Sequence, residues 1–440
     1  MTDEELKKMS KAELISALKD CRVQLNSLKD RDLGIFWEEK TENISNNLKK
    51  KHPILKEIKN KKIQTDKNKL TNILIEGDNF NALSVLNCTH SGRIDVVCTD
   101  PPYNTGNKDF IFNDDYVDKE DTYRHSKWLS FMEKRLSLTK DLMTEEGIFF
   151  CNIDDNEQSQ LKLLCDKIFT EDNFIATIVW QKVYSPKNQS DKISIDTEYV
   201  LCYAKNKKKA KYDLLPRTEK MDKAYKNPDK DPRGRWKPGD LIANEERKNG
   251  HYKVKSPSGK IFDAPSGKHW GVTKTEFKRL DIDNRVYWGK NGDAIPSLKQ
   301  FLTEVQQGRK ASTLFLHEEV GHTDEAKKEL KKHFGQSKDL FSTPKPPRLI
   351  KQLLRLCKNK NPIVLDLFAG SGTTGVAMLE MMQQSELKGK FILCTNNENN
   401  ICTQVCYPRI KNTIKGYITK EQKPKKIKGT SGNLRYFKTD

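Results

Sequence analysis

The sequence contains no long apolar segment. Across its 440 residues, no apolar run approaches the roughly 18 to 20 residues that a membrane-spanning helix requires. The N-terminal segment Met1-Thr2-Asp3-Glu4-Glu5 also lacks the basic and apolar regions of a secretory signal. These absences predict a cytoplasmic protein that has no membrane partner.

Cysteine is present, but not in the patterns that build disulfide frameworks or zinc sites. The ten cysteines are scattered, no CxxC pair occurs, and Cys402 and Cys406, the closest two, have three residues between them. His317 and His322 resemble part of a zinc-protease signature, but they are five positions apart rather than four and would not share a helix face. The sequence therefore predicts no metal site.

Acidic residues are outnumbered, and the imbalance is unevenly placed. Lys and Arg total 80 against 61 Asp and Glu, a formal net charge of +19. Residues 41–70 hold nine Lys against three acidic residues, residues 205–340 hold 32 basic against 20, and residues 403–440 hold ten against two. Such segments suit a polyanion, because neutralising phosphates releases counterions. A Lys-rich solvated surface would give the same composition, so charge alone does not decide.

Alternating strand and helix patterns from about residue 71 indicate an α/β domain. The leucines over residues 3–30 have helical spacing, which suits a helix packed on its own domain or one that binds a partner. Residues 206–340 break the α/β rhythm with Gly, Pro, Lys and aromatics. The expected strands lie near 73–75, 94–98, 147–151, 175–180, 198–204, 362–368 and 391–395, and the expected helices near 81–86, 124–143, 347–357 and from the glycine turn to about 382.

These changes of pattern divide the chain into five expected parts, with one sheet split by an insertion. They are a Lys-rich helical extension (1–70), a first α/β half (71–205), an inserted domain (206–340), a second α/β half (341–417) and a basic C-terminal tail (418–440).

The segment Asp100-Pro101-Pro102-Tyr103 follows a predicted strand and carries groups suited to holding an amine. Asp100 can accept a hydrogen bond from an exocyclic amine, and the fixed φ of consecutive prolines lets the Pro101 carbonyl act as a second acceptor. Tyr103 offers a ring on which a base taken out of a duplex can stack. The alternative is an Asp-Pro-Pro turn that only ends a strand.

A second segment runs from a predicted strand into a glycine turn and a helix start. In Asp366-Leu367-Phe368-Ala369-Gly370-Ser371-Gly372-Thr373-Thr374-Gly375, the glycines allow close approach of a ligand and the helix start favours an anion. Gly370 to Gly375 also matches GxGxxG, so a nicotinamide dehydrogenase is an alternative; it would need an acidic residue about 20 positions on. Glu398 comes later than that, and no Lys follows the glycines as in a P-loop.

Asp78 closes the predicted strand before the Asp100 strand, in Glu76-Gly77-Asp78-Asn79-Phe80. A short acidic turn there could reach an adenine or a ribose. An ordinary N-cap for the following helix explains the same residues equally well.

Together, strand-DPPY and strand-DLFAGSG resemble the amino-methyltransferases of DNA. The catalytic motif precedes the cofactor motif, with a basic insertion between them, which resembles the β class and most closely the Mod subunits of type III restriction-modification systems. The resemblance covers about residues 72–417. It includes Trp128 with Arg135-Leu136, Gly147-Ile148-Phe149 through Ile153-Asp154-Asp155-Asn156-Glu157, Glu198-Tyr199-Val200-Leu201, Thr343-Pro344-Lys345-Pro346 and Cys406-Tyr407-Pro408-Arg409-Ile410.

This resemblance implies an α/β fold: a Rossmann-like S-adenosyl-L-methionine-dependent methyltransferase sheet with circularly permuted motif order and an inserted α+β target-recognition domain. It implies that Asp100 and the Pro101 carbonyl orient the target amine and that Tyr103 stacks on the flipped base. Asp78 would lie at the cofactor's adenine, and Lys345 with the two Thr hydroxyls near its carboxylate. The implied cofactor-binding residues are Asp78, Lys345, Asp366, Phe368, Gly370, Gly372, Thr373 and Thr374.

Two departures from the family pattern stand out. Thr395 closes the second strand where the family often has an acidic residue for the ribose, so Glu398 is a replacement candidate. Mod subunits are also generally longer than this chain. Double-stranded DNA is the expected partner, while a restriction (Res) subunit and a homodimer both stay open.

The leading hypothesis is therefore methylation of adenine N6 in DNA. The family resemblance implies adenine rather than cytosine N4, because position 100 is Asp rather than Ser. The alternatives are cytosine-N4 methylation, a non-catalytic DNA-recognition subunit and the nicotinamide dehydrogenase.

Overall fold

The computed structural model describes residues 10, 11, 14, 18, 19, 37–44, 53–185, 193–244, 248–335 and 341–439. The helix expected over residues 3–30 lies almost wholly outside these residues. The chain forms two compact units: a main unit of Met1–Asp213 with Ser312–Asp440, and a second unit of Leu214–Ala311.

An eleven-stranded sheet organises the described part of the main unit. Its order is β1-β22-β3-β19-β18-β4-β7-β9-β8-β17, and β2 pairs with β22 beside that path. The strands are β1 (Leu55–Glu57), β2 (Ile63–Gln64), β3 (Thr71–Glu76), β4 (Ile94–Thr99), β7 (Met143–Ile153), β8 (Phe174–Gln181), β9 (Thr197–Ala204), β17 (Leu314–Phe315), β18 (Ile363–Asp366), β19 (Lys390–Thr395) and β22 (Asn433–Thr439).

The middle of the sheet is parallel. β22, β3, β19, β18, β4 and β7 run the same way, while β9 is antiparallel to both β7 and β8. In the centre, Val364 and Leu365 of β18 lie beside Val96 and Val97 of β4. Parallel strands end at one edge, so the segments that follow β3, β4, β7, β18 and β19 all meet there, where open α/β sheets bind ligands.

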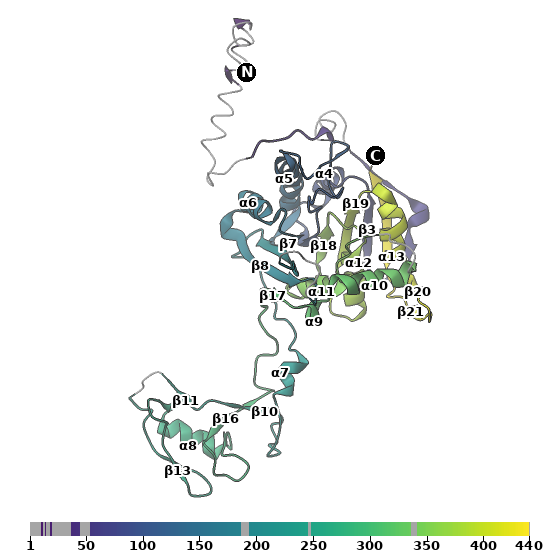
Figure 1. Ribbon diagram of the computed structural model, residues 1–440. Coiled ribbons are helices and arrows are strands. Elements are labelled where there is room, and N and C mark those ends of the chain that lie inside the picture. Colours follow the sequence, from purple (N-terminus) through teal and green to yellow (C-terminus); the bar gives the residue numbers. More distant parts are fainter. Residues whose placement is uncertain are drawn as a thin grey trace. The chain divides into compact units, whose positions relative to one another are not determined.

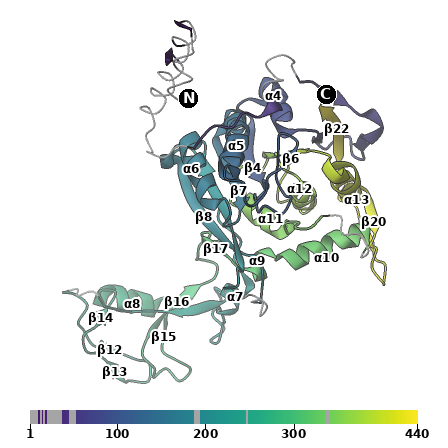
Figure 2. The same ribbon diagram turned by 45° about the horizontal axis from the view of Figure 1, so that its top comes forward.

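Helices cover both faces of this sheet (Figures 1 and 2). α4, α5 and α6 pack in sequence on one face, and α11, α12 and α13 on the other. The main-unit helices are α4 (Asn79–His90), α5 (Arg124–Leu142), α6 (Gln158–Phe169), α9 (His317–Val320), α10 (Thr323–Phe334), α11 (Pro347–Arg355), α12 (Thr373–Gln383) and α13 (Tyr407–Lys415); short hairpins are β5 (Ile111–Phe112) with β6 (Asp115–Tyr116) and β20 (Gly416–Ile418) with β21 (Lys426–Lys428). The strands and helices expected from periodicity between residues 71 and 205 and between 341 and 417 are confirmed.

The second unit is smaller than the insertion expected from composition, 206–340. Residues 312–335 belong to the main unit instead, because Leu314 and Phe315 pair in parallel with β8 and Glu329 of α10 binds Arg409. Within the second unit, small sheets and helices pack around Trp270, Phe277 and Trp288. Its elements are α7 (Glu219–Lys223), β10 (Trp236–Gly239), β11 (Ile242–Ala243), β12 (Val254–Lys255), β13 (Ile261–Phe262), β14 (His269–Trp270), α8 (Lys274–Ile282), β15 (Val286–Tyr287) and β16 (Ser297–Phe301).

The C-terminal segment is not a tail, contrary to the expectation for residues 418–440. β22 inserts between β1 and β3, where Leu434 and Tyr436 are fully buried and the Tyr436 hydroxyl donates to the Glu76 carboxylate. The many Lys and Arg residues obscured a period-two pattern, in which Arg435 alternates with the buried side chains. β1 and β2 likewise join residues 55–64 of the expected extension to this sheet.

None of the helices among the described residues has the length and apolar character needed to span a bilayer.

Because β22 lies inside the sheet, its buried side chains should stabilise the fold. Leu434→Ala removes a fully buried side chain from the sheet and should lower the free energy of unfolding by about 2–5 kcal/mol. Urea unfolding followed by circular dichroism measures the loss. Lys428→Ala, at an exposed position in β21, is the control and should leave the transition in place. Equal stability of the two variants would show that this strand is a dispensable tail.

Candidate functional site

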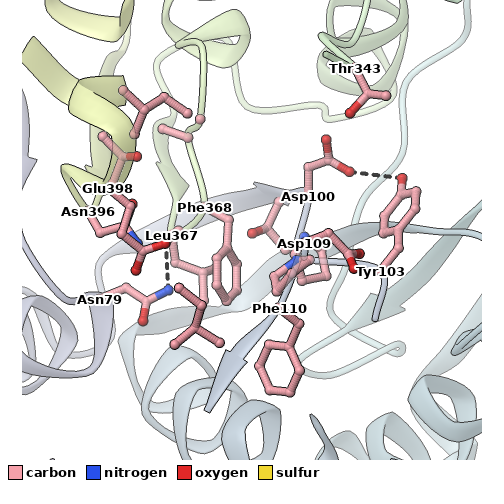
Figure 3. Close-up of a pocket in the computed structure, with 18 of the residues that line it drawn as sticks. Asn79, Asp100, Tyr103, Asp109, Phe110, Thr343, Leu367, Phe368, Asn396 and Glu398 are labelled. Atoms are coloured by element: carbon pink, nitrogen blue, oxygen red, sulfur yellow. Dashed lines mark hydrogen bonds between the residues drawn. The ribbon is translucent and has the colours of Figure 1, made fainter. Parts of the chain in front are cut away.

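A cavity of about 1160 Å³ opens where the parallel strands end. Asp100 and Tyr103 lie on one side of it, Asn396 and Glu398 on the other, and Phe368 between them (Figure 3). The cavity thus brings together segments that are nearly 300 residues apart in the chain. Its lining includes Asp78, Asp100, Pro101, Pro102, Tyr103, Lys345, Asp366, Phe368, Gly370, Thr373, Thr374 and Glu398, which are the predicted site residues apart from Gly372.

Asp100 is held by two donors. The Lys345 ammonium lies 3.0 Å from Asp100 Oδ2, and the Tyr103 hydroxyl donates to Oδ1 at 2.9 Å. The Asp100 side chain is 26% exposed and the Lys345 side chain 7%. Burial raises the pKa of the Asp100 carboxyl, against the lowering effect of the Lys345 charge. Burial alone would lower the pKa of Lys345, but Asp100 and Glu198 outweigh it and raise that pKa.

Lys345 lies between the two halves of the cavity. Its backbone carbonyl does lie beside the glycine turn, where it accepts a hydrogen bond from Thr373 Oγ1 at 3.2 Å. Its ammonium, however, lies between the carboxylates of Asp100 and Glu198. Contact with a cofactor carboxylate stays a prediction.

Glu198 is the residue that sequence reasoning missed. It lies in β9, and its Oε2 is 3.1 Å from the Tyr103 hydroxyl and 3.4 Å from Lys345 Nζ. Lys182 Nζ is 3.2 Å from Oε1. Burial would raise the pKa of Glu198, but the Lys345 and Lys182 charges lower it below its usual range. The only sequence signal was its place in Glu198-Tyr199-Val200-Leu201, which carried no role.

The backbone of the Asp100-Pro101-Pro102-Tyr103 segment is held by hydrogen bonds from neighbouring elements. The indole of Trp128, fully buried in α5, donates to the Pro102 carbonyl at 2.7 Å. Asn104 follows with φ of +56°, and its side-chain amide donates to the Arg124 carbonyl and to Glu157. Asn tolerates this left-handed conformation better than most residues. The extended Asp-Pro-Pro stretch thus ends in a fixed turn.

The two glycines of the second motif have different surroundings. Both have positive φ, +51° at Gly370 and +79° at Gly372. Gly370 lines the cavity, and a Cβ there would lie 3.1 Å from the Phe341 ring. Gly372 is the N-cap of α12, and a Cβ there would lie 3.1 Å from Cys406 Sγ, so it permits close helix packing rather than lining the cavity.

Asp366 and the two threonines are tied to one another and to their neighbours. Thr374 Oγ1 donates to Asp366 Oδ2 at 2.6 Å, and the Phe368 amide donates to Oδ1 at 3.1 Å. Buried Arg409, from Cys406-Tyr407-Pro408-Arg409-Ile410, donates to Ser371 and Thr373 from behind the turn. The hydroxyls of Thr373 and Thr374 are thus used inside the protein, whereas the first turn of α12 leaves backbone amides without intrahelical partners.

Asp78 is an N-cap and also lines the cavity. Its Oδ1 accepts from the Phe80 and Asn81 amides, and its Oδ2 lies 3.1 Å from the guanidinium of fully buried Arg135. Glu42 binds the same guanidinium through both oxygens, at 2.8 and 3.0 Å. Residues 42–44 also line the cavity, which the sequence did not predict.

Glu398 lies in η3 (Glu398–Asn400), just beyond β19, and lines the cavity. Burial raises the pKa of its carboxyl, and the nearby Asp78 charge raises it further. An acidic side chain therefore follows the C-terminal end of β19, although the strand itself ends in Thr395.

The histidines set aside in the sequence have structural partners. His317 Nδ1 lies 2.8 Å from Gln181 Oε1, and His322 accepts from the Glu325 amide as the N-cap of α10. No group of three or more possible metal ligands occurs in the described ranges.

The burial of Asp366 predicts a pH-dependent stability. Burial raises the pKa of its carboxyl from 3.8 to about 7, against the Thr374 hydrogen bond. The folded state therefore favours the protonated acid, and stability falls as the pH rises from 3.8 to 7. Asp366→Asn should remove this loss, so its unfolding free energy relative to the wild type should increase by roughly 1–3 kcal/mol between pH 5 and pH 8.

Denaturant unfolding at both pH values measures the difference. Asp115→Asn, at an exposed position in β6, is the matched control and should show no such trend. A pH-independent difference for Asp366→Asn would contradict the raised pKa.

Comparisons with known proteins agree with this geometry. Residues 94–406 match the model of a family described as DNA methylase, N6_N4_Mtase. The type III restriction-modification enzyme StyLTI Mod subunit of Salmonella typhimurium strain LT2 is 33% identical over 79% of this chain and 56% of the relative. The EcoP15I Mod subunit of Escherichia coli is 27% identical over 77% and 60%, and the type II methyltransferase M.KpnI of Klebsiella pneumoniae 30% over 75% and 82%.

The chain thus spans a little more than half the length of the Mod subunits it matches. The family match covers most of the chain and includes the Asp100 and Asp366 segments that line one cavity. This protein belongs to the DNA methylase family.

Proposed function

We propose that this chain transfers the methyl group of S-adenosyl-L-methionine to N6 of an adenine flipped out of duplex DNA. The observation that carries the proposal is the parallel pairing of β4 with β18, which places the Asp100 and Asp366 segments around one cavity. Family membership supports an amino group of DNA as the acceptor.

The residues at the Asp366 side suit this cofactor. Gly370 leaves room where a Cβ would approach Phe341, and the first-turn amides of α12 suit a carboxylate. Phe368 presents an apolar ring, and the Glu398 carboxylate suits ribose hydroxyls. When bound, the cofactor supplies an electrophilic methyl group on a sulfonium. Asp78, Asp366, Phe368, Gly370 and Glu398 would hold it.

The Asp100 side suits the amine. Asp100 accepts a hydrogen bond from the amine, the Pro101 carbonyl offers a second acceptor, and the ring of Tyr103 supports the extruded base. Holding both amine hydrogens would orient the nitrogen lone pair toward the methyl group, so positioning supplies most of the acceleration and no strong base is needed. The N–C bond would form as the C–S bond breaks, S-adenosyl-L-homocysteine would leave, and the methylated nitrogen would then release one proton.

Adenine N6 rather than cytosine N4 is proposed because, by family resemblance, Asp rather than Ser at position 100 favours adenine. The family model includes both kinds of enzyme, and the pocket chemistry is the same for both amines. Membership in the DNA methylase family leaves no support for the nicotinamide dehydrogenase. A non-catalytic recognition subunit is disfavoured because Asp100 and Tyr103 both line the cavity.

We further propose that the second unit, Leu214–Ala311, recognises the DNA sequence. Lys and Arg outnumber Asp and Glu there by 22 to 13, which favours contact with phosphates. A restriction subunit is the proposed protein partner, because the two Mod relatives are named as subunits of type III restriction-modification enzymes.

A transfer assay tests the function. The purified chain is incubated with methyl-labelled S-adenosyl-L-methionine and genomic DNA, and the digested nucleosides are separated by mass. We expect N6-methyladenine, confined to one sequence context when the modified positions are mapped. N4-methylcytosine would overturn the choice of base, and no label on any DNA would overturn the proposal.

Asp100→Ala separates catalysis from binding. It removes an acceptor for the amine, so methyl transfer should fall by at least about 100-fold. Lys345 and Tyr103 keep Glu198 as a partner, so the fold and the affinities for cofactor and DNA should stay close to wild type. Asp115→Ala is the control in turnover and calorimetric binding assays. Near-normal turnover of Asp100→Ala would show that Asp100 has another role.

A further inference from the structure

Two carboxylates in the cavity share the same two donors. The Tyr103 hydroxyl lies 2.9 Å from Asp100 Oδ1 and 3.1 Å from Glu198 Oε2. The Lys345 ammonium lies 3.0 Å from Asp100 Oδ2 and 3.4 Å from the same Glu198 oxygen. Each oxygen of Asp100 therefore has a donor already, and each of those donors has an alternative acceptor within reach.

Strand direction explains why Glu198 is there. β9 runs antiparallel to β7 and β8, so its first residues lie at the edge where the parallel strands end. Tyr199 pairs with Ile153, and Glu198 with Trp180. The Glu198 side chain is 12% exposed. Because β4 and β7 lie between β18 and β9 in the sheet, Glu198 reaches the cavity from the side opposite β18.

An amine that approaches Asp100 competes with these donors. An Asp100 oxygen that accepts from an ammonium at 3.0 Å keeps a second lone pair, but the nearby positive charge makes it a weaker acceptor for another hydrogen. Freeing Asp100 without another acceptor would leave the Lys345 charge, 7% exposed, without a partner, and an unpaired buried charge is strongly unfavourable. The site needs a second acceptor that can take both donors.

We propose that Glu198 is a positioning residue that takes the Lys345 ammonium and the Tyr103 hydroxyl from Asp100 when the target amine arrives. The inference rests on the proposed function. Glu198 touches neither the amine nor the methyl group; it acts by releasing Asp100 as an acceptor. Lys182, 3.2 Å from Glu198 Oε1, keeps the carboxylate in place during this exchange.

The charges around Asp100 determine in which direction its pKa should shift when Glu198 loses its charge. The charge of Glu198 raises the pKa of the Asp100 carboxyl, while Lys345 lowers it. Loss of the Glu198 charge should therefore lower the pKa of Asp100 and strengthen its hold on Lys345. The ionisable groups facing the two carboxylates are Lys345, Tyr103, Lys182 after β8, Asp154 after β7 and Asp366 after β18.

Glu198→Gln keeps the shape and removes the charge. We expect its kcat to fall by roughly 10- to 100-fold, the effect typical of losing a residue that orients an active-site group, with the affinities for cofactor and DNA unchanged. The acid limb of its pH–rate profile should move to lower pH, although the plateau is lower. A side chain with only a structural role would lower the rate without moving that limb in this direction.

Two further variants serve as controls for Glu198→Gln. Glu198→Asp keeps the charge, so its acid limb should stay near that of the wild type and its kcat should lie between those of the wild type and Glu198→Gln. This variant also serves if Glu198→Gln does not fold. Glu120→Gln, at an exposed position, is the matched control and should behave as wild type in both measurements.

A second readout needs no turnover. Carbon-13 NMR of labelled Asp carboxyls, with Asp100 assigned through Asp100→Asn, should give a lower pKa for Asp100 in Glu198→Gln than in the wild type. An unchanged or higher pKa, or wild-type kcat in Glu198→Gln, would overturn the role of Glu198. Wild-type chain that methylates no DNA would instead overturn the proposed function, and the NMR titration would still test the coupling between Glu198 and Asp100.

Discussion

The parallel pairing of β18 with β4 is the constraint on which the site depends. Val364 and Leu365 lie beside Val96 and Val97, so the Asp366 and Asp100 segments leave the sheet side by side. Neither segment forms a site alone, because one carries acceptors for an amine and the other a glycine turn and a helix start. The second unit lies between β4 and β18 in the chain, yet the two strands are neighbours in the sheet.

Around this edge, charge is balanced by groups from separate elements. Asp100 follows β4, Glu198 begins β9, Lys182 follows β8 and Lys345 precedes α11. Two carboxylates and two ammonium groups that are mostly buried stabilise one another, because removing either sign would leave a buried charge unpaired. The Lys345 charge opposes the rise that burial causes in the pKa of the Asp100 carboxyl.

A second buried cation supports the other half of the cavity. Arg135, in α5, binds Asp78 at the end of β3 and Glu42 from the segment before the sheet, and its guanidinium lies 3.6 Å from the centre of the Phe131 ring. Arg409 supports the glycine turn in the same way from α13. The two arginines hold loops whose own sequences, rich in Gly and Asp, would not fix their shape.

The sequence by itself determined the local features: the strands and helices with clear periodicity, the Asp-Pro-Pro-Tyr turn, the glycine turn and the order of the two motifs. These depend on backbone preferences and on side chains close together in the chain, and all the predicted site residues except Gly372 line the cavity. Only the tertiary structure revealed the contacts of Glu198, Arg135 and Glu42. It also placed the boundary between the two units after Ala311 and showed that β22 lies inside the sheet. Each of these depends on a partner far away in the sequence, and a residue pattern does not reveal which distant strand or charge it will meet.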